Sequence, residues 1–212
     1  TGDDIRLFGL QICPDLDSVM YTLGGGADEE RGWGRANESF TVLEELRRYG
    51  AKPDWFGLGD RDIATHLVRT QALDAGYRLS SVTAGLCERW QLPVSLVPMS
   101  DDRVETHVII DDPDSGQPAA IHFQEWWVRH RAAVAARQFV YVGSESATPA
   151  PGVIEAIAAA DVIILPPSNP VVSIAPILSV PGIRAAVTQA SATVVGVSPI
   201  VGGKPVRGMA DA

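Results

Sequence analysis

Cysteine, positive charge and long apolar runs are all scarce in this sequence. Only two of its 212 residues are cysteines, Cys13 and Cys87, which excludes a disulfide framework and a cysteine-based metal site. Acidic residues outnumber basic ones, 26 against 17, so the net charge of -9 excludes the basic face that nucleic acid or anionic lipid requires. No apolar run is long enough to span a membrane, and no signal peptide pattern occurs. We therefore expect a cytoplasmic protein with reduced thiols, and neither nucleic acid nor a membrane as a partner.

Several sequence signatures of catalytic sites are also absent. There is no Walker phosphate loop, no Gly-x-Gly-x-x-Gly after a strand, and no Gly-x-Ser-x-Gly nucleophile turn. The four histidines lack the spacing of a helical metal site. Three consecutive glycines at 24–26 follow an expected helix rather than a strand, so they are a weak candidate for a phosphate site. Carboxylates and small polar loops are therefore the main candidates for function.

The hydrophobic pattern is typical of an α/β protein. Helices are expected at 18–23, 39–49, 60–75, 80–91, 124–129, 153–160 and 181–189, and strands at 94–99, 104–110, 119–123, 139–142, 161–165 and 193–197. A turn signal at 112–116 joins two of these strands into a hairpin. Apolar strands alternate with helices in the last third, which indicates a parallel sheet covered on both faces. We predict a Rossmann-like, three-layer αβα fold with a mainly parallel sheet plus a β-hairpin and helical insertion.

Aspartates gather where elements begin. Asp15 and Asp17 stand at the mouth of the first expected helix, where Asp17 is a good N-cap, and Asp3 and Asp4 lie just upstream. Mg²⁺ is held in proteins by one or two carboxylates together with waters and substrate phosphates. Asp3, Asp15 and Asp17 are therefore candidate metal ligands, and the alternative for any one of them is a simple structural role such as helix capping.

A second acidic junction, Asp60-Arg61-Asp62, precedes the helix expected to end at 75. Arg61 stands between two acids that could hold it and direct it at a phosphate or a ring carbonyl. His66 lies one turn after Asp62 and faces roughly the same way, so it could contact a ligand there. The alternatives are that the aspartates cap the helix and that His66 is a partly buried structural residue.

Two loops after apolar strands carry small polar residues. Ser168 and Asn169 follow the strand at 161–165, and Ser198 and Pro199 follow the strand at 193–197. Ligands of open α/β sheets bind beyond the carboxyl ends of the strands, so both loops would face one site. Serine and asparagine offer donors and acceptors to a base or a phosphate, although ordinary turn chemistry is the alternative for either loop alone.

Aromatic residues concentrate in two further places. Trp33 stands between two glycines in a polar loop, where it is either a stacking platform or lid, or a side chain that packs the loop on the core. The segment 122–127 places Trp126 and Trp127 beside Gln124 and Glu125. Core packing explains some of these rings but not the polar residues among them.

Taken in order, these stretches resemble the CofD/FbiA family, the phospholactate or phosphoenolpyruvate transferases that build the deazaflavin coenzyme F-420. The resemblance is carried by the segments at 2–4, 12–17, 20–26, 31–34, 58–62, 64–66, 100–102, 122–127, 167–170 and 198–200. It covers essentially the whole chain and is closest to the actinobacterial branch. The family's N-terminal strand with its glycine-rich loop and its C-terminal portion are missing here, so we expect the 212 residues to be the central part of a longer chain.

The resemblance implies one α/β domain over 1–212, with 17–92 as a mostly helical acceptor-side portion and 138–205 as a parallel-sheet nucleotide-side portion. It implies Mg²⁺-dependent transfer of a phospholactyl or phosphoenolpyruvyl group from a guanosine-diphosphate-linked donor to the deazaflavin FO, with release of GMP, by a homodimer. The implied residues are Asp15, Asp17 and Arg61 for catalysis, Asp17, Asp60, Arg61, His66 and Trp126 for FO, Ser168, Asn169, Ser198 and Pro199 for the nucleotide, and Asp3, Asp15 and Asp17 for the metal.

Two other functions stay open. A related branch of the same superfamily, typified by the YvcK gluconeogenesis factors, binds UDP-sugars without transferase activity. A Mg²⁺-dependent phosphodiester hydrolase, in which water replaces the acceptor alcohol, is a third possibility. Binding of FO discriminates the transferase from the UDP-sugar module, and donor breakdown without FO would indicate the hydrolase.

Overall fold

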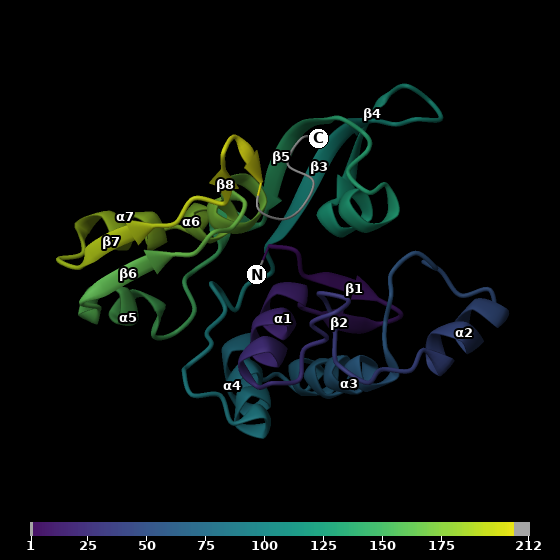
Figure 1. Ribbon diagram of the computed structural model, residues 1–212, viewed down its shortest axis with the longest axis horizontal. Helices are drawn as coiled ribbons and strands as arrows, with labels where there is room; N and C mark the ends of the chain where they lie inside the picture. The colour runs from purple at the N-terminus through teal and green to yellow at the C-terminus, as the bar shows by residue number, and fades with distance from the viewer. Residues whose placement is uncertain (1, 206–212) are drawn as a thin grey trace. The chain divides into compact units, whose positions relative to one another are not determined.

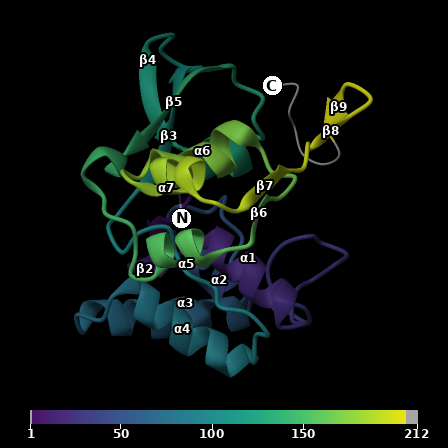
Figure 2. The ribbon, with the colours of Figure 1, turned by 90° about the vertical axis from the view of Figure 1, so that its left-hand side faces the viewer.

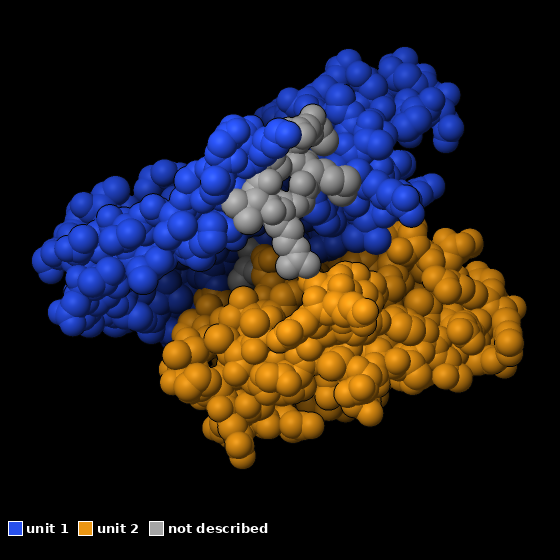
Figure 3. All heavy atoms as spheres, viewed as in Figure 1, with its two compact units in different colours: residues 1–3, 99–212 blue, residues 4–98 orange. Residues whose placement is uncertain are grey.

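A computed structural model describes residues 2–205 of the chain, which divides into two compact units (Figure 3). Unit 1 comprises residues 1–3 and 99–212, and unit 2 comprises residues 4–98. The expected helical portion at 17–92 therefore lies within unit 2, and the expected nucleotide-side portion at 138–205 lies within unit 1.

Unit 2, all of whose residues are described, combines a short hairpin with helices (Figure 1). Strands β1 (Ile5–Leu7) and β2 (Leu10–Ile12) pair antiparallel and are followed by α1 (Pro14–Leu23), α2 (Thr41–Arg48), α3 (Asp60–Asp74) and α4 (Leu79–Trp90). Two core clusters join α1 to α4, one around Cys13, Leu16 and Leu79 and one around Met20, Tyr21 and Cys87. Burial of these apolar side chains is the main force that holds the helices together.

The first half of unit 1 is an antiparallel sheet. Strand β3 (Glu105–Asp111) lies between β4 (Pro118–His122) and β5 (Ala136–Val142), and a single π-helical turn, η1 (Glu125–Arg129), follows β4. Residues of β3 alternate between buried and half-buried, as expected for a strand with one face on a core. Val108 and Ile110 pack there with Phe123 and Trp126.

The second half of unit 1 contains a parallel strand pair. In chain order, the elements are η2 (Ser144–Ser146), α5 (Val153–Ala159), β6 (Val162–Leu165), η3 (Pro170–Ile174), α6 (Ala175–Ser179), α7 (Ile183–Gln189), β7 (Thr193–Gly196), β8 (Ile200–Val201) and β9 (Lys204–Pro205). Strands β6 and β7 pair in parallel, and β8 and β9 form a small hairpin that continues from β7 (Figure 2).

The α/β class and the hairpin at 104–123 are confirmed. The expectation of a mainly parallel sheet is met only by β6 and β7 within the described residues, because β1–β2, β3–β4, β3–β5 and β8–β9 are antiparallel. The strand expected at 94–99 is wrong. Pro93 precedes that segment and Pro98 lies within it. Neither can donate to a ladder, and the chain there is irregular.

The expected short helix at the start of the chain begins earlier than predicted. Pro14 occupies the first turn of α1, so Asp17 lies inside the helix and is not its N-cap. The segment 170–179, for which the sequence pattern predicted no helix, forms η3 and α6, each with a proline in its first turn. Among residues 2–205, no single helix has the length and apolar composition of a membrane span; one pair, Pro170–Ser179 with Ile183–Gln189, meets those criteria only jointly, across a 92° bend.

Candidate functional site

The predicted site residues are divided between the two units. Asp15, Asp17, Asp60, Arg61 and His66 lie in unit 2, whereas Asp3, Trp126, Ser168, Asn169, Ser198 and Pro199 lie in unit 1. Each set therefore forms its own local arrangement, and the richest one is in unit 2, between α1 and α3.

Asp17 is buried against α3 and forms an ion pair with Arg69. Asp17 is 4% exposed and Arg69 1% exposed. Both carboxylate oxygens of Asp17 accept hydrogen bonds from the guanidinium, and the distance from Nη1 to Oδ2 is 3.0 Å. Burial raises the pKa of Asp17 above its ordinary value, and the charge of Arg69 opposes that rise. The pair ties the first turn of α1 to the middle of α3.

Asp62 forms the second half of this buried network. The hydroxyl of Tyr21 donates to Oδ1 of Asp62 over 2.6 Å, and Oδ2 lies 3.4 Å from Nε2 of His66, one turn along α3. Burial alone would raise the pKa of Asp62, but the His66 and Tyr21 hydrogen bonds and the nearby positive charge outweigh it and lower that pKa. Burial, with the charges of Asp17 and Asp62, raises the pKa of Tyr21, so the phenol keeps the proton it donates.

His66 connects the two carboxylates through its ring nitrogens. Nδ1 lies 3.2 Å from Nη1 of Arg69. An arginine N–H can only donate, so Nδ1 is the acceptor and the ring proton belongs on Nε2, which faces Asp62. The distance from Nδ1 to Oδ2 of Asp17 is 3.6 Å, too long for a hydrogen bond. The order of contacts is therefore Tyr21, Asp62, His66, Arg69 and Asp17.

Asp60 has a capping role, but for a different helix from the one expected. Its carboxylate accepts from the backbone N–H groups of Thr41 and Val42, at the start of α2, and from the Ser39 hydroxyl. The hydrogen bonds from Val42 and Ser39 hold the pKa of Asp60 below its ordinary value. The start of α3 is capped in return by Glu38, which accepts from the backbone N–H groups of residues 61 and 62 at 2.9 and 2.8 Å.

Asp15 and Arg61 are the exposed members of the predicted set in unit 2. Asp15 lies in the first turn of α1 and Arg61 in the first turn of α3. Within residues 2–205, no group of three or more His, Cys, Asp or Glu side chains is arranged to hold a metal ion. A Mg²⁺ bound mainly through substrate phosphates needs only one or two carboxylates, which the exposed Asp15 fits better than the ion-paired Asp17.

The glycines at 24–26 have a packing role. A Cβ on Gly24 would lie 2.8 Å from the Trp90 ring, and one on Gly26 would overlap that ring. Trp90 also packs on Tyr21, with ring centroids 5.2 Å apart, and the Arg35 guanidinium lies 4.9 Å from its ring centroid. Gly24 and Gly26 therefore allow the close approach of α4 to the end of α1, which is a structural reason for the run.

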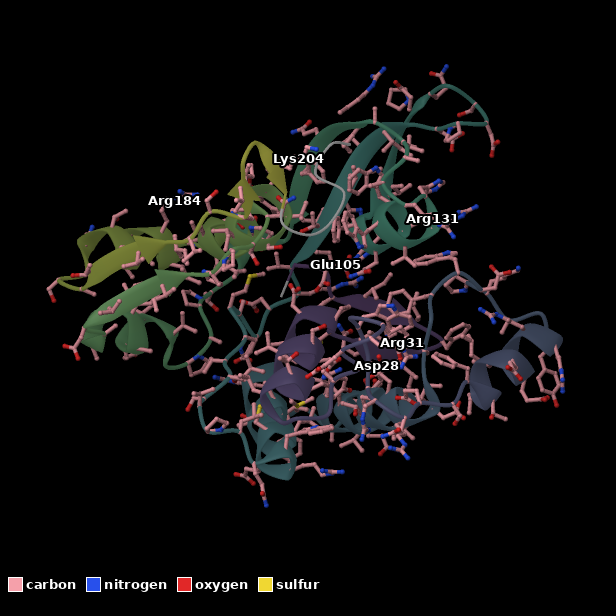
Figure 4. The ribbon with its side chains drawn as sticks, in the orientation of Figure 1. Asp28, Arg31, Glu105, Arg131, Arg184 and Lys204 are labelled. Atoms are coloured by element: carbon pink, nitrogen blue, oxygen red, sulfur yellow. The ribbon has the colours of Figure 1, made fainter. Side chains whose placement is uncertain are left out.

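The loop that carries Trp33 is held by an internal ion pair. Arg31 donates to Oδ2 of Asp28 over 2.6 Å, and its guanidinium lies 5.0 Å from the Trp33 ring centroid (Figure 4). A Cβ on Gly57 would lie 2.8 Å from the Trp33 ring, so the indole packs over that glycine. Trp33 nevertheless stays 47% exposed. It packs the loop and still presents part of its ring to solvent.

In unit 1, Asp3 and Trp126 are both buried. Oδ2 of Asp3 accepts from the Gln124 amide over 2.7 Å. Trp126 is 4% exposed in the core cluster of the antiparallel sheet, and its indole N–H donates to the Val134 carbonyl over 2.7 Å. The packing explanation therefore accounts for Trp126, and the adjacent Gln124 is explained by its contact with Asp3.

The two polar loops of unit 1 follow β6 and β7, as expected. Oδ1 of Asn169 accepts from the backbone N–H groups of residues 171 and 172 and caps η3. Ser168 lies beside it, half-buried. In the second loop, the hydroxyl of Ser198 exchanges hydrogen bonds with the backbone of Ile200 across Pro199, both at 3.1 Å. Both loops are thus locally stabilised turns at the carboxyl ends of a parallel pair.

Arg69 and Tyr21 are members of the network that the sequence argument missed. A signal for Arg69 was present, because 62, 66 and 69 follow the spacing of one helix face. Thr65 and Thr70 are buried on the same helix, so the buried side of α3 carries polar residues. An arginine within a helix usually suggests a solvated face, so its spacing from His66 was the only pointer.

The sequence matches a known family over its full length. The family model described as 2-phospho-L-lactate transferase CofD matches residues 1–212. The chain is 66% identical over 212 residues to the phosphoenolpyruvate transferase of Thermobifida fusca and 67% identical over 211 residues to that of Streptomyces griseus. Both alignments span 100% of this chain but only 65% and 66% of the two longer proteins. The chain thus spans just under two thirds of these relatives.

Solved structures support the fold. Protein BH3568 from Bacillus halodurans matches with a TM-score of 0.59 at 18% sequence identity, over 92% of this chain and 56% of that one. A second structure of BH3568, described as a member of the UPF0052 family, gives a TM-score of 0.56 at 19% identity, over 90% of this chain and 56% of that one. At such identities the likeness concerns the fold alone.

Proposed function

Because the chain belongs to the CofD family, we propose that it is the larger part of a transferase of coenzyme F-420 biosynthesis. The observation that carries this proposal is the match over residues 1–212, together with relatives that are 66% and 67% identical and are named phosphoenolpyruvate transferases. Those names favour a phosphoenolpyruvyl group over a phospholactyl group as the one transferred. FO is the proposed acceptor, and a guanosine-diphosphate-linked phospho-acid is the proposed donor.

The proposed reaction exchanges one phosphorus–oxygen bond for another. A hydroxyl oxygen of the ribityl chain of FO attacks the phosphorus that carries the enolpyruvyl group. The bond from that phosphorus to the bridging oxygen breaks, GMP leaves with the bridging oxygen, and the hydroxyl proton passes to a base. Such transfers depend mostly on positioning and on neutralising charge on the phosphoryl oxygens.

In unit 2, we assign Asp15 and Arg61 to the reacting groups because both are exposed at helix starts. Asp15 is the proposed protein ligand of Mg²⁺, which when bound would neutralise charge on the donor phosphates. Arg61 would contact a phosphate or a ring carbonyl. Asp17 and His66 are proposed to act through Arg69 and Asp62, by holding α1 against α3. Direct ligation by Asp3 or Asp17, and FO contacts of Asp60 and Trp126, stay predictions.

In unit 1, we assign the nucleotide to the loops after β6 and β7. Ser168, Asn169, Ser198 and Pro199 lie there, and the capping bond of Asn169 uses its oxygen, so its amide nitrogen is the donor proposed for the nucleotide. A homodimer and a cytoplasmic location are part of the same proposal. Light scattering of the natural gene product gives the mass in solution that tests the homodimer.

The experiment that tests the function uses the full natural gene product with Mg²⁺, FO and each of the two guanosine-diphosphate-linked donors. We expect GMP release and a product that keeps FO fluorescence and gains the phospho-acid, with phosphoenolpyruvyl as the preferred group. Absence of GMP with verified substrates would refute the transferase. UDP-sugar binding without FO binding, or donor breakdown without FO, would instead support one of the two alternatives.

Variants refine this test. Asp15→Asn should lower turnover at least tenfold with an unchanged melting temperature. Glu44→Gln is the matched control, because Glu44 is also an exposed carboxylate in the first turn of a helix. If both variants turn over equally, Asp15 has no part in the reaction. Calorimetric titration of Mg²⁺ in the presence of GDP, with the same two variants, provides a reading that does not depend on turnover.

A further inference from the structure

Arg61 is held through its backbone, although its side chain is exposed. The Arg61 N–H donates to Oε2 of Glu38 over 2.9 Å, and the Arg61 carbonyl accepts from Nη1 of Arg35 over 2.9 Å. The other oxygen of Glu38 accepts from the N–H of Asp62 over 2.8 Å. One short segment of unit 2, residues 35–38, thus fixes both backbone groups of the residue proposed to contact a phosphate or a ring carbonyl.

The two aspartates beside Arg61 are engaged with other partners. Asp60 accepts from backbone N–H groups at the start of α2, and Asp62 accepts from the Tyr21 hydroxyl. The sequence suggested that these two acids hold Arg61 between them. In the structure, the contacts that hold its backbone come from the segment 35–38.

Gly59 makes room for the Glu38 carboxylate. A Cβ on Gly59 would overlap Cδ of Glu38 and lie 2.6 Å from its Oε2. The Gly59 backbone, at φ −77° and ψ 154°, has a conformation that other residues adopt without strain. The glycine is therefore needed for the close approach of Glu38 and not for the shape of the backbone.

Arg35 is itself anchored on two aromatic rings. Its guanidinium lies 4.9 Å from the centroid of the Trp90 ring and 5.7 Å from that of the Tyr21 ring. The faces of such rings attract a cation. Tyr21 belongs to a core cluster of unit 2, and Trp90 packs against that cluster. The donor to the Arg61 carbonyl is therefore fixed to the core that joins α1 to α4.

We propose that Glu38 is a positioning residue of the proposed active site, which holds the backbone of Arg61 where its guanidinium reaches an oxygen of a substrate. Arg35 has the same role at the carbonyl of Arg61. The inference rests on the proposed transferase, because it gives Arg61 a substrate to contact. A displacement of about 1 Å in a catalytic site can lower the rate by about a hundredfold. Loss of one anchor should therefore lower kcat/KM by roughly ten- to hundredfold while the Arg61 side chain is intact.

Kinetics of the full natural gene product with Mg²⁺, FO and the phosphoenolpyruvyl donor test the proposal. Glu38→Gln keeps the size of the side chain but leaves one oxygen acceptor for two N–H groups. We expect it to lower kcat/KM by about tenfold or more. A higher KM for the donor would indicate that Arg61 contacts a phosphate, and a higher KM for FO would indicate the ring carbonyl. Glu44→Gln is the matched control, because Glu44 is an exposed carboxylate of α2, and its kcat/KM should stay within twofold.

Two double variants separate positioning from a merely structural role. In an Arg61→Gln background, Glu38→Gln should change kcat/KM by less than twofold, because Glu38 acts through Arg61. In a Glu38→Ala background, Gly59→Ala should have an equally small effect, because the carboxylate that its Cβ would displace is gone. Val82→Ala removes buried methyl groups from α4, so it should lower the melting temperature and leave both KM values unchanged.

Two kinetic outcomes would overturn the proposal. One is a kcat/KM of Glu38→Gln within twofold of the unsubstituted protein, and the other is additive losses when Glu38→Gln is combined with Arg61→Gln. Failure of the transferase itself is recognised separately, because the unsubstituted protein would then release no GMP. In that case, titrations with FO and with GDP and Mg²⁺ decide. Weaker binding of either probe by Glu38→Gln than by Glu44→Gln supports the positioning role, and equal binding overturns it.

Discussion

The Asp17–Arg69 pair allows the stabilising effect of the buried network to be measured. Asp17→Asn keeps the shape of the side chain but removes its charge, and it leaves Arg69, 1% exposed, without its carboxylate partner. Removing one member of a buried ion pair costs about 3–5 kcal/mol. Asp62 still interacts with the charge of Arg69, so we expect the lower end of that range, about 3 kcal/mol.

Thermal unfolding followed by far-ultraviolet circular dichroism is the assay. In a chain of this size, each 1 kcal/mol lowers the melting temperature by about 2–4 °C, so Asp17→Asn should melt about 6–12 °C below the unsubstituted protein. Asp15→Asn is the control, because it makes the same change two residues away at an exposed position. Its cost should stay within about 0.5 kcal/mol, or about 2 °C.

Two further measurements localise the effect. Hydrogen exchange in Asp17→Asn should speed up in α1 and α3, which the pair joins, and stay unchanged in β3. The double variant with Arg69→Met should cost less than the sum of the two single variants, by about 0.5–3 kcal/mol, because the two residues interact directly. The reasoning fails if Asp17→Asn and Asp15→Asn have the same melting temperature and the cost of the double variant equals the sum of its two single variants. The ion pair would then not stabilise the protein.

Three other substitutions test separate contacts. Gly26→Ala should lower the free energy of unfolding in urea by about 1–3 kcal/mol, because a Cβ there overlaps the Trp90 ring, whereas Gly85→Ala, whose Cβ meets nothing, should be neutral or stabilising. Asn169→Ala should lower the free energy of unfolding by about 1 kcal/mol in the same assay, because the cap of η3 is lost. An unchanged free energy of unfolding would show that the cap does not stabilise the protein. Asp62 has a lowered pKa in the folded protein, so its carboxylate stabilises the fold above the unfolded value of about 3.9, and this contribution is lost as the pH falls through the folded value. Asp62→Asn should therefore lose stability less steeply in acid, by up to about 1.4 kcal/mol per pH unit, and equal acid slopes in denaturation curves would contradict this.

The helices with clear stop signals were predictable from the sequence. Expected bounds of 60–75 and 80–91 compare with 60–74 and 79–90 for α3 and α4. Periodic apolar residues and a following glycine are local signals, and local interactions decide the ends of such helices. The hairpin of β3 and β4 was predictable for the same reason, because its turn residues and its alternation are both local.

Elements that depend on tertiary contacts were not predictable. Strands β1 and β2 have three residues each, too few for a periodic pattern to show. No helix was predicted over η3 and α6, although Pro170 and Pro176 each stand in the first turn of a helix, where a missing N–H costs nothing. The strand expected at 94–99 had the right composition, but Pro93 before it and Pro98 within it cannot donate the hydrogen bonds of a strand pair.

The position of the start of α1 has the largest consequence for the candidate site. If the helix began at residue 18, Asp15 and Asp17 would share a turn and could hold one ion together. Because it begins at Pro14, both aspartates are helical, and two residues of a helix separated by one other point roughly 200° apart around its axis. One carboxylate therefore faces α3 and the other faces solvent, as their exposures require. Two residues that look equivalent in the sequence thus differ in their surroundings: Asp17 is paired with Arg69, and Asp15, which is exposed, is the one that we propose for the metal.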